Sequence, residues 1–156
     1  MSTKTLPASA LLLGIAGWIP FWIPVALSAH ALLTGRSAAA EEWMFTVYAG
    51  LILSFLGGVR WGREIMARDV PDLAVLSASV APSVLGLMGA LIHWAGHPYF
   101  AWMLLAISLL VMMAWDRQAA ARGELPAWFG RLRLILTLGA VGSAIAMILL
   151  YLLARS

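Results

Sequence analysis

This sequence contains no cysteine, which excludes disulfide bonds, thiolate metal sites and thiol catalysis. It is also poor in charge, because Asp, Glu, Lys and Arg make up 11% of the chain against 63% hydrophobic residues. It lacks a GxSxG nucleophile motif, a glycine-rich phosphate loop and a carboxylate pair within an apolar span. We therefore expect no catalytic activity of the common hydrolase or nucleotide-binding kinds, and the sequence predicts no cofactor.

Five long apolar stretches, separated by short loops, fill most of the chain. A bilayer core about 30 Å thick requires roughly 20 apolar residues per helix. The pattern predicts an all-α, polytopic membrane protein embedded in the lipid bilayer. We expect a single five-transmembrane-helix bundle over residues 1–156, with helices at Ala8–Leu33, Trp43–Trp61, Leu73–Trp94, Tyr99–Trp115 and Leu132–Leu153.

The first stretch resembles a secretory signal peptide, because Lys4 precedes an apolar run and Ala29-His30-Ala31 has the form of a cleavage site. The run is too long for a usual signal sequence, and Pro20 and Pro24 interrupt it. We expect it to be retained as the first helix, kinked by these prolines.

Trp18 and Trp22 lie four residues apart in this first helix and near its middle, whereas tryptophans usually lie at membrane interfaces. Two interpretations remain open. The tryptophans either pack a kinked helix tightly against its neighbours or form an aromatic wall of a ligand cavity.

Basic residues gather on one side of the predicted topology. With ten Lys and Arg in the chain, eight fall on the side of the N-terminus and two, Arg36 and Arg155, on the other. This bias predicts an N-terminus in the cytoplasm or an organelle matrix and an exported C-terminus. It also argues against nucleic acid as the partner of this basic chain. The eight are Lys4, Arg60, Arg63, Arg68, Arg117, Arg122, Arg131 and Arg133.

Small residues recur every four positions in the second helix, a spacing that lets another helix backbone approach closely. They are Gly50, Ser54, Gly58 and Gly62, with Gly57 beside them. Shorter small-residue rows in the third helix and at Gly139 and Ser143 of the fifth predict close packing among these three helices. The row in the second helix serves either this internal packing or a partner protein.

Charged residues at the cytoplasmic ends of the helices form the main candidate site. Arg60 and Glu64 have the spacing of a helical ion pair, and Asp116, at a helix C-terminus, requires a cation, for which Arg133 is the first choice. The alternatives are a structural belt of ion pairs and a pocket for an anion or lipid head group. The candidate binding residues are Arg60, Trp61, Asp116, Trp128, Arg131 and Arg133.

Three histidines, His30, His93 and His97, fall on the opposite side, near Glu41 and Glu42. Imidazole and carboxylate groups bind zinc, copper or haem iron, but the spacing matches no metal motif. They are weak metal candidates, and we expect interfacial histidines without a metal.

Three segments together resemble one protein family. Residues 48–62 (YAGLILSFLGGVRWG) carry a paired glycine and a Trp-Gly ending, and Asp116-Arg117 precedes the spaced motifs LPAW at 125–128 and LRLILT at 132–137. Pro20-Phe21 matches a Pro-Phe in the first helix. These segments resemble the uncharacterised bacterial and mitochondrial family that includes transmembrane protein 69 of animals. The resemblance implies a polytopic inner-membrane protein and implies no reaction.

Two functions follow as hypotheses. The first is a non-catalytic inner-membrane bundle that binds a membrane-protein partner or a lipophilic ligand, in an assembly or accessory role. The alternative is a small intramembrane enzyme or carrier that acts on a lipid or quinone head group at the cytoplasmic face, with Arg60, Asp116 and Arg133 lining its site.

Overall fold

The computed structural model describes residues 5–155, so Lys4 lies outside the described residues. Within that range the chain is all-α, and five helical segments are long and apolar enough to cross a membrane. The helices are α1 (Ala8–Ala16), α2 (Ile19–Leu33), α3 (Ala39–Ala67), α4 (Leu73–Trp94), α5 (Pro98–Ala121) and α6 (Ala127–Leu153). The all-α, five-span bundle predicted from the sequence is therefore confirmed.

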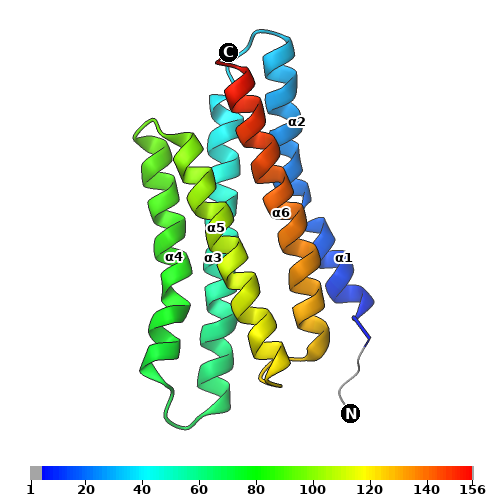
Figure 1. Cartoon of the computed structure of the whole chain (residues 1–156), viewed down its shortest axis with the longest axis vertical. Coiled ribbons are helices and arrows are strands. Elements are labelled where there is room, and N and C mark those ends of the chain that lie inside the picture. The colour runs from blue at the N-terminus through cyan, green and yellow to red at the C-terminus, as the bar shows by residue number, and fades with distance from the viewer. Residues whose placement is uncertain (1–4, 156) are drawn as a thin grey trace.

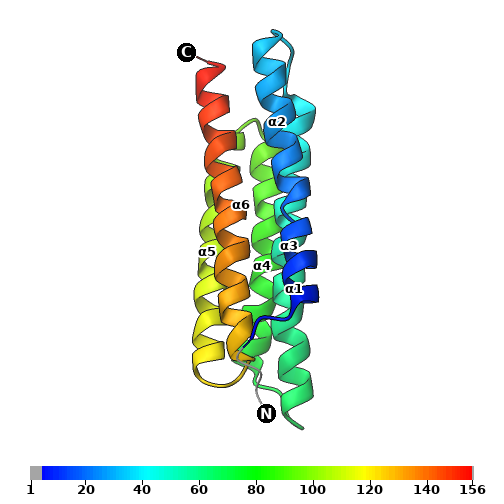
Figure 2. The ribbon, with the colours of Figure 1, turned by 90° about the vertical axis from the view of Figure 1, so that its right-hand side faces the viewer.

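The helices run along the long axis of the molecule, and the two chain ends lie at opposite ends of it (Figures 1 and 2). The α3–α4 and α5–α6 loops share one end with the N-terminus, which we call the N-terminal end. The α2–α3 and α4–α5 loops share the other, C-terminal end. Helix α3 packs most extensively against α4, α5 against α6, and α2 against both α3 and α6.

The first span consists of two helices, because the chain breaks at Gly17 and Trp18. Pro20 occupies the first turn of α2, where its missing N–H costs nothing, and the break lies just before it. Pro24 lies inside α2 without ending it. Of the two prolines, only Pro20 marks the interruption that the sequence predicted.

Three helices extend beyond their predicted spans at the N-terminal end. Helix α3 continues to Ala67, α5 to Ala121, and α6 begins at Ala127. The added turns of α3 and α5 carry charged side chains, so hydropathy alone ends these two helices too early. Glu64 and Asp116 in these turns are bound by arginines, as described below, whereas the added start of α6, residues 127–131, is mostly uncharged.

Buried residues form one core along the axis, and large apolar side chains cover much of the outside. Leu12, Phe55, Leu87 and Leu153 are each at least 60% exposed, an arrangement that suits a lipid environment and not water. The buried core comprises Phe21, Val25, Phe45, Ala49, Leu53, Leu56, Trp102, Leu105, Leu109, Met112, Ala140, Ala144 and Met147.

The small-residue row of α3 is only partly used in packing. Gly50 faces Gly86 of α4, and a methyl group placed on Gly50 would lie 3.2 Å from the Gly86 carbonyl oxygen. A methyl group on Gly57 would collide with the Ser79 carbonyl oxygen. Ser54 accepts a hydrogen bond of 3.0 Å from the Ser83 hydroxyl.

The predicted helix packing does not hold at Gly58 and Gly62. Nothing lies within 4 Å of a methyl group placed on either residue. The packed positions are 50, 54 and 57, which share one helix face, and 58 and 62 lie off it because each residue turns the helix by about 100°. The small row of α6 also packs differently from the prediction, since Gly139 receives the indole of Trp18 and not a residue of α3 or α4.

Candidate functional site

A buried ion pair joins α5 to α6 near the N-terminal end. Arg133 Nε donates a hydrogen bond of 2.9 Å to Asp116 Oδ2, and the two side chains are 6% and 2% exposed. The pairing predicted from the sequence is thus present, and it is buried inside the protein.

Arg60 of α3 adds a second buried guanidinium to this pair. It is 3% exposed and stacks over the Trp115 ring, with 4.3 Å from its Cζ to the ring centroid. Asp116 interacts electrostatically with Arg60 as well as with Arg133. The three residues therefore form a cluster of two cations and one anion, which we call the buried charge cluster.

The predicted pair of Arg60 and Glu64 is wrong. Glu64 is fully buried and instead binds Arg63 and Arg68, each at 3.3 Å, and accepts the backbone N–H of Asp72. Arg60 Nη2 lies 3.7 Å from Glu124 Oε2. The i, i+4 rule counts only neighbours within a helix, whereas here a loop residue takes the place of Glu64.

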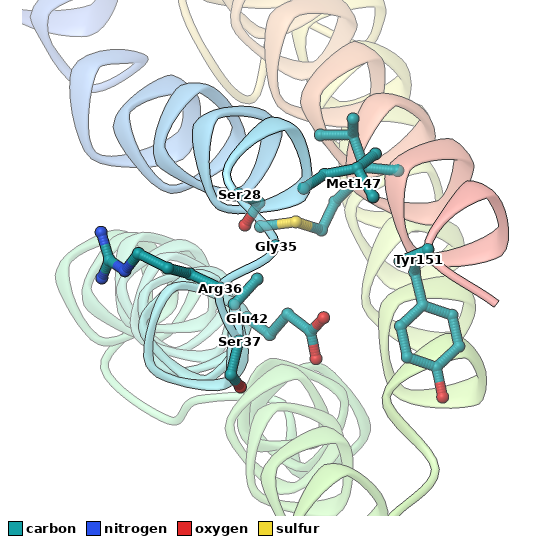
Figure 3. A pocket seen from close by; sticks show the side chains of 11 residues that line it. Ser28, Gly35, Arg36, Ser37, Glu42, Met147 and Tyr151 are labelled. Atoms are coloured by element: carbon teal, nitrogen blue, oxygen red, sulfur yellow. The ribbon is translucent and has the colours of Figure 1, made fainter.

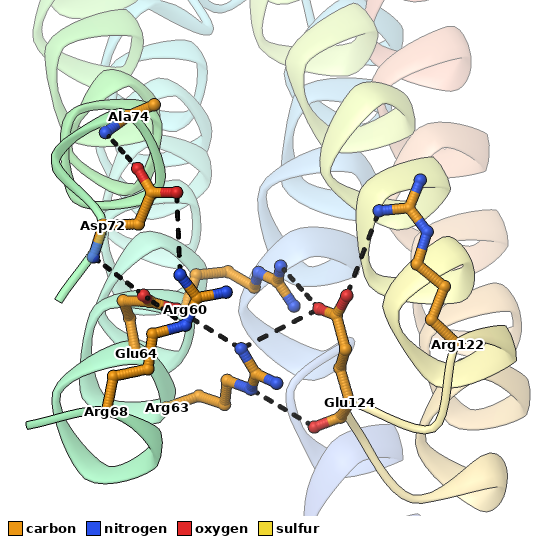
Figure 4. Close-up of polar contacts among 8 residues, drawn as sticks. All are labelled: Arg60, Arg63, Glu64, Arg68, Asp72, Ala74, Arg122 and Glu124. Carbon is orange, nitrogen blue, oxygen red and sulfur yellow. Dashed lines mark hydrogen bonds and ion pairs between the residues drawn. The ribbon is translucent and has the colours of Figure 1, made fainter.

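Glu124 holds the N-terminal end together (Figure 4). Gly123 has φ of 76°, a conformation that glycine adopts without strain, and it turns the chain so that the Glu124 carboxylate faces α3. This carboxylate lies 3.7–3.9 Å from Arg60, Arg63 and Arg122, and the Glu124 carbonyl accepts from Arg63 Nε. Glu124 is therefore shared among three arginines, Arg60 included.

Several polar atoms of the buried charge cluster and its neighbour Thr137 lack hydrogen-bond partners among the described residues. They are Arg60 Nε and Nη1, Asp116 Oδ1, Arg133 Nη2 and Thr137 Oγ1. Buried polar groups are nearly always hydrogen-bonded, and an unmet one costs free energy. A set of unmet atoms in one region is the expected mark of a site for a ligand or ordered water.

An apolar cleft of about 320 Å³ reaches this region from the side of the first span. Arg133 and Thr137 lie in its wall, Arg133 being the lining residue of α6 nearest the N-terminal end. The remaining lining is almost wholly apolar and comes from α1, α2, α3, α5 and α6: Leu13, Gly14, Gly17, Trp18, Phe21, Tyr48, Ile52, Phe55, Leu56, Leu109, Leu136 and Ala140.

The break in the first span shapes this cleft. Tyr48 donates its hydroxyl to the Gly17 carbonyl at 3.0 Å, and Trp18 Nε1 donates to the Leu136 carbonyl at 3.1 Å. These bonds satisfy a carbonyl that the break leaves free and anchor the indole against α6. Trp18 is thus both tightly packed and part of a cavity wall, so the two interpretations of this residue hold together. Trp22 lies outside the cleft and is 42% exposed.

The other candidate residues of this end do not join the cluster. Trp61 is 41% exposed, and Trp128 is half-buried beside Phe129. Arg131 is exposed and lines a separate hollow with Arg117. Helical periodicity explains the difference, because Arg131 and Arg133 are two positions apart and point to different sides of α6.

The three histidines are not brought together. His30 and His97 are exposed, and His93 is half-buried with Nδ1 2.5 Å from Thr46 Oγ1. Within residues 5–155, no three side chains of the metal-binding types form a group. Trp102 Nε1 also donates to Thr46 Oγ1, at 2.9 Å. Sequence reasoning missed this buried bond, which an isolated threonine in an apolar span could have signalled.

A second cavity, of about 340 Å³, lies at the C-terminal end between α2, α3 and α6 (Figure 3). Ser28, Glu42 and Tyr151 line it, while Arg36 points away from Glu42 and Tyr151. Ser28 is buried, and its hydroxyl has no partner among the described residues. This polar cavity is separate from the apolar cleft and shares no lining residue with it.

The fold and the cleft define a polytopic helical membrane protein with charged groups buried beside an apolar cavity. Residues 6–149 match the family described as Protein of unknown function (DUF3429), and the chain belongs to that family. It is 36% identical to transmembrane protein 69 of Xenopus tropicalis over 146 residues, which cover 91% of this chain and 54% of the frog protein.

The similar protein of Mus musculus, also named transmembrane protein 69, is 28% identical over 149 residues, covering 92% of this chain and 57% of its own. The chain therefore spans about half the length of these relatives. No solved structure matches the chain. The family resemblance inferred from the sequence is confirmed.

Proposed function

We propose that this protein is a non-catalytic membrane protein that binds a lipophilic ligand in the cleft between the first span, α3 and α6. One observation carries the proposal: the cleft has an apolar lining and ends at two buried polar residues, Arg133 and Thr137, with unmet polar atoms. Ligand pockets typically combine such an apolar wall with a few polar groups that fix orientation. The volume of about 320 Å³ lies at the small end of the range for such pockets.

Partner binding, in an assembly or accessory role, has its own support. Gly58 and Gly62 are four residues apart on α3, and both have open space before them. An open row of this kind accepts a helix of another protein. Ligand binding remains the better supported part of the proposal, because the cleft offers polar atoms that require a partner and the glycine row does not.

A head-group enzyme or carrier is the second candidate. The observation that favours it is the position of the buried charge cluster at one end of the bundle. Against it, Asp116 is the one carboxylate of the cluster and is held by Arg133 at 2.9 Å. Its Oδ2 is already engaged by the guanidinium and does not face the cleft, so we place ligand binding first.

We also propose a bacterial inner membrane as the location, with the N-terminal end in the cytoplasm. Arg60, Arg63, Arg68, Arg117, Arg122, Arg131 and Arg133 all lie on helices or loops at that end, and only Arg36 and Arg155 at the other. The excess of arginine follows the positive-inside rule.

Photolabelling tests the binding proposal. The probe is hexadecanol bearing a diazirine on its chain, added to the protein in lipid bilayers. We expect labelling of cleft residues in the wild type and its loss in Ile52→Trp, which fills the cleft from α3. Leu51→Trp is the matched control, because Leu51 is 61% exposed and outside the cleft. Label spread evenly over lipid-facing residues, unchanged in Ile52→Trp, would overturn the proposal.

A further inference from the structure

The buried charge cluster gathers two guanidinium groups around one carboxylate. Arg60, Arg133 and Asp116 are 3%, 5% and 1% exposed, and Glu64, the other buried carboxylate at this end of the described chain, is bound by Arg63 and Arg68. Glu124 is 28% exposed and lies 3.7 Å from Arg60, beyond hydrogen-bond distance. Arg133 is the cation of this cluster that lines the cleft, and a guanidinium there attracts an anion and repels a second cation.

The unmet hydrogen-bond atoms indicate the same sign. Three are guanidinium nitrogens, which donate only, and one is a carboxylate oxygen, which accepts only. Arg133 and Thr137 line the cleft, whereas Asp116 and its open oxygen do not. Arg60 does not line it either, so the unmet atoms on cleft-lining residues are one guanidinium N–H and one hydroxyl. Both can donate to a negatively charged oxygen once a side-chain movement exposes them to the cleft.

We infer that the ligand is a single-chain amphiphile with a small anionic head group, a carboxylate or a phosphate. Its chain lies along the apolar lining, and its head group accepts from Arg133 Nη2 and the Thr137 hydroxyl. This inference rests on the proposed function. The cleft volume of about 320 Å³ lies at the small end of the range for ligand pockets, which favours one hydrocarbon chain over the two chains of a glycerophospholipid.

Arg133 can bind Asp116 and a ligand head group at the same time. Its Nε is bound to Asp116 Oδ2, and its Nη2 has no partner among the described residues. Asp116 thus fixes the guanidinium in place, and the Nη2 edge of the planar guanidinium remains for the head group. Orientation before binding reduces the entropy that the ligand would otherwise have to overcome.

Competition experiments test this inference. Hexadecanoate, its methyl ester and hexadecanol compete with the diazirine probe for the cleft, at a pH where hexadecanoate is ionised. A hydrogen bond to a charged group contributes about 1.5–3 kcal/mol, so hexadecanoate should compete about tenfold better than hexadecanol or more. Equal competition by acid, ester and alcohol would refute the anionic head group.

Variants separate the roles of the two polar residues. Asp116→Asn with Arg133→Gln removes one charge of each sign, so the net charge of the cluster stays the same, and should abolish the preference for the acid. Thr137→Val removes a hydroxyl that is unmet without ligand, so stability should hold while acid competition falls about three- to tenfold. Arg117→Gln, at an exposed residue, is the control and should keep the full preference.

The outcomes distinguish this inference from the proposed function. The ratio of acid to alcohol within one bilayer is compared between variants, so partitioning into lipid cancels. Labelling of the cleft without acid preference, or a preference that persists in the double variant, overturns the anionic head group and leaves the ligand site standing. Failure of every probe to label the cleft overturns both.

Discussion

Breaking the Asp116–Arg133 pair should destabilise the fold more than removing it altogether. The pair has one hydrogen bond of 2.9 Å, and its side chains are 2% and 6% exposed, so water screens it little. Removing one partner of a buried pair costs about 3–5 kcal/mol, because the other charge stays buried without compensation. We expect Asp116→Asn and Arg133→Gln each to lower the free energy of unfolding by an amount in this range.

The double variant should cost less than the sum of the single variants. It buries no net new charge, and the asparagine and glutamine amides can bond to each other. We expect the shortfall, which measures the coupling, to be about 1–3 kcal/mol. In Arg133→Gln, Arg60 still interacts with Asp116 and partly compensates its charge. We therefore expect Arg133→Gln to cost less stability than Asp116→Asn.

The assay is reversible unfolding in mixed micelles, followed by circular dichroism and tryptophan fluorescence. Arg117→Gln, one residue from Asp116 but exposed, is the control and should stay within about 0.5 kcal/mol of the wild type. Additive single costs would show that the residues act independently, and a cost of Arg133→Gln below about 0.5 kcal/mol would show that the pair does not lie in a low-dielectric region.

Three further predictions follow from the structure. Gly57→Ala should lower stability by about 1–3 kcal/mol, because the methyl group collides with the Ser79 carbonyl, whereas Gly58→Ala should be neutral in thermal melts; equal melting points would refute the packing of α3 on α4. Gly139→Val should displace the Trp18 indole and reduce probe labelling of the cleft, measured by mass spectrometry of labelled peptides. Unchanged labelling would contradict the position of Trp18 in the cleft wall. A C-terminal alkaline phosphatase fusion in bacteria should be active if the C-terminal end is exported as we propose, and activity of a cytoplasmic reporter there would reverse the orientation.

The sequence alone determined the class, the number of spans and the family. These properties depend on composition summed over about 20 residues per span, so tertiary contacts hardly alter them. The Asp116–Arg133 pair was also predicted, from a carboxylate expected at a helix C-terminus. Helix α5 in fact continues to Ala121, and the pair forms because the short loop brings α6 back beside α5.

Tertiary structure decided which of several equivalent residues are used. Gly57 and Gly58 are adjacent and chemically identical, but helix rotation places one against α4 and leaves the other open. Arg60 pairs with Glu124 and not with Glu64, because the α5–α6 loop places a carboxylate from 64 residues further along the chain beside it, beyond the reach of any helical spacing rule.

The cleft was also decided by the tertiary structure. Its walls come from five helices, and its polar end arises because Arg133 and Thr137, one turn apart on α6, meet the break in the first span. The sequence predicted an interruption at the prolines and an aromatic residue beside it. Only the packing of α2 against α3 and α6 decided that the interruption opens beside a buried guanidinium, because a cavity is a property of several surfaces at once and of no single segment.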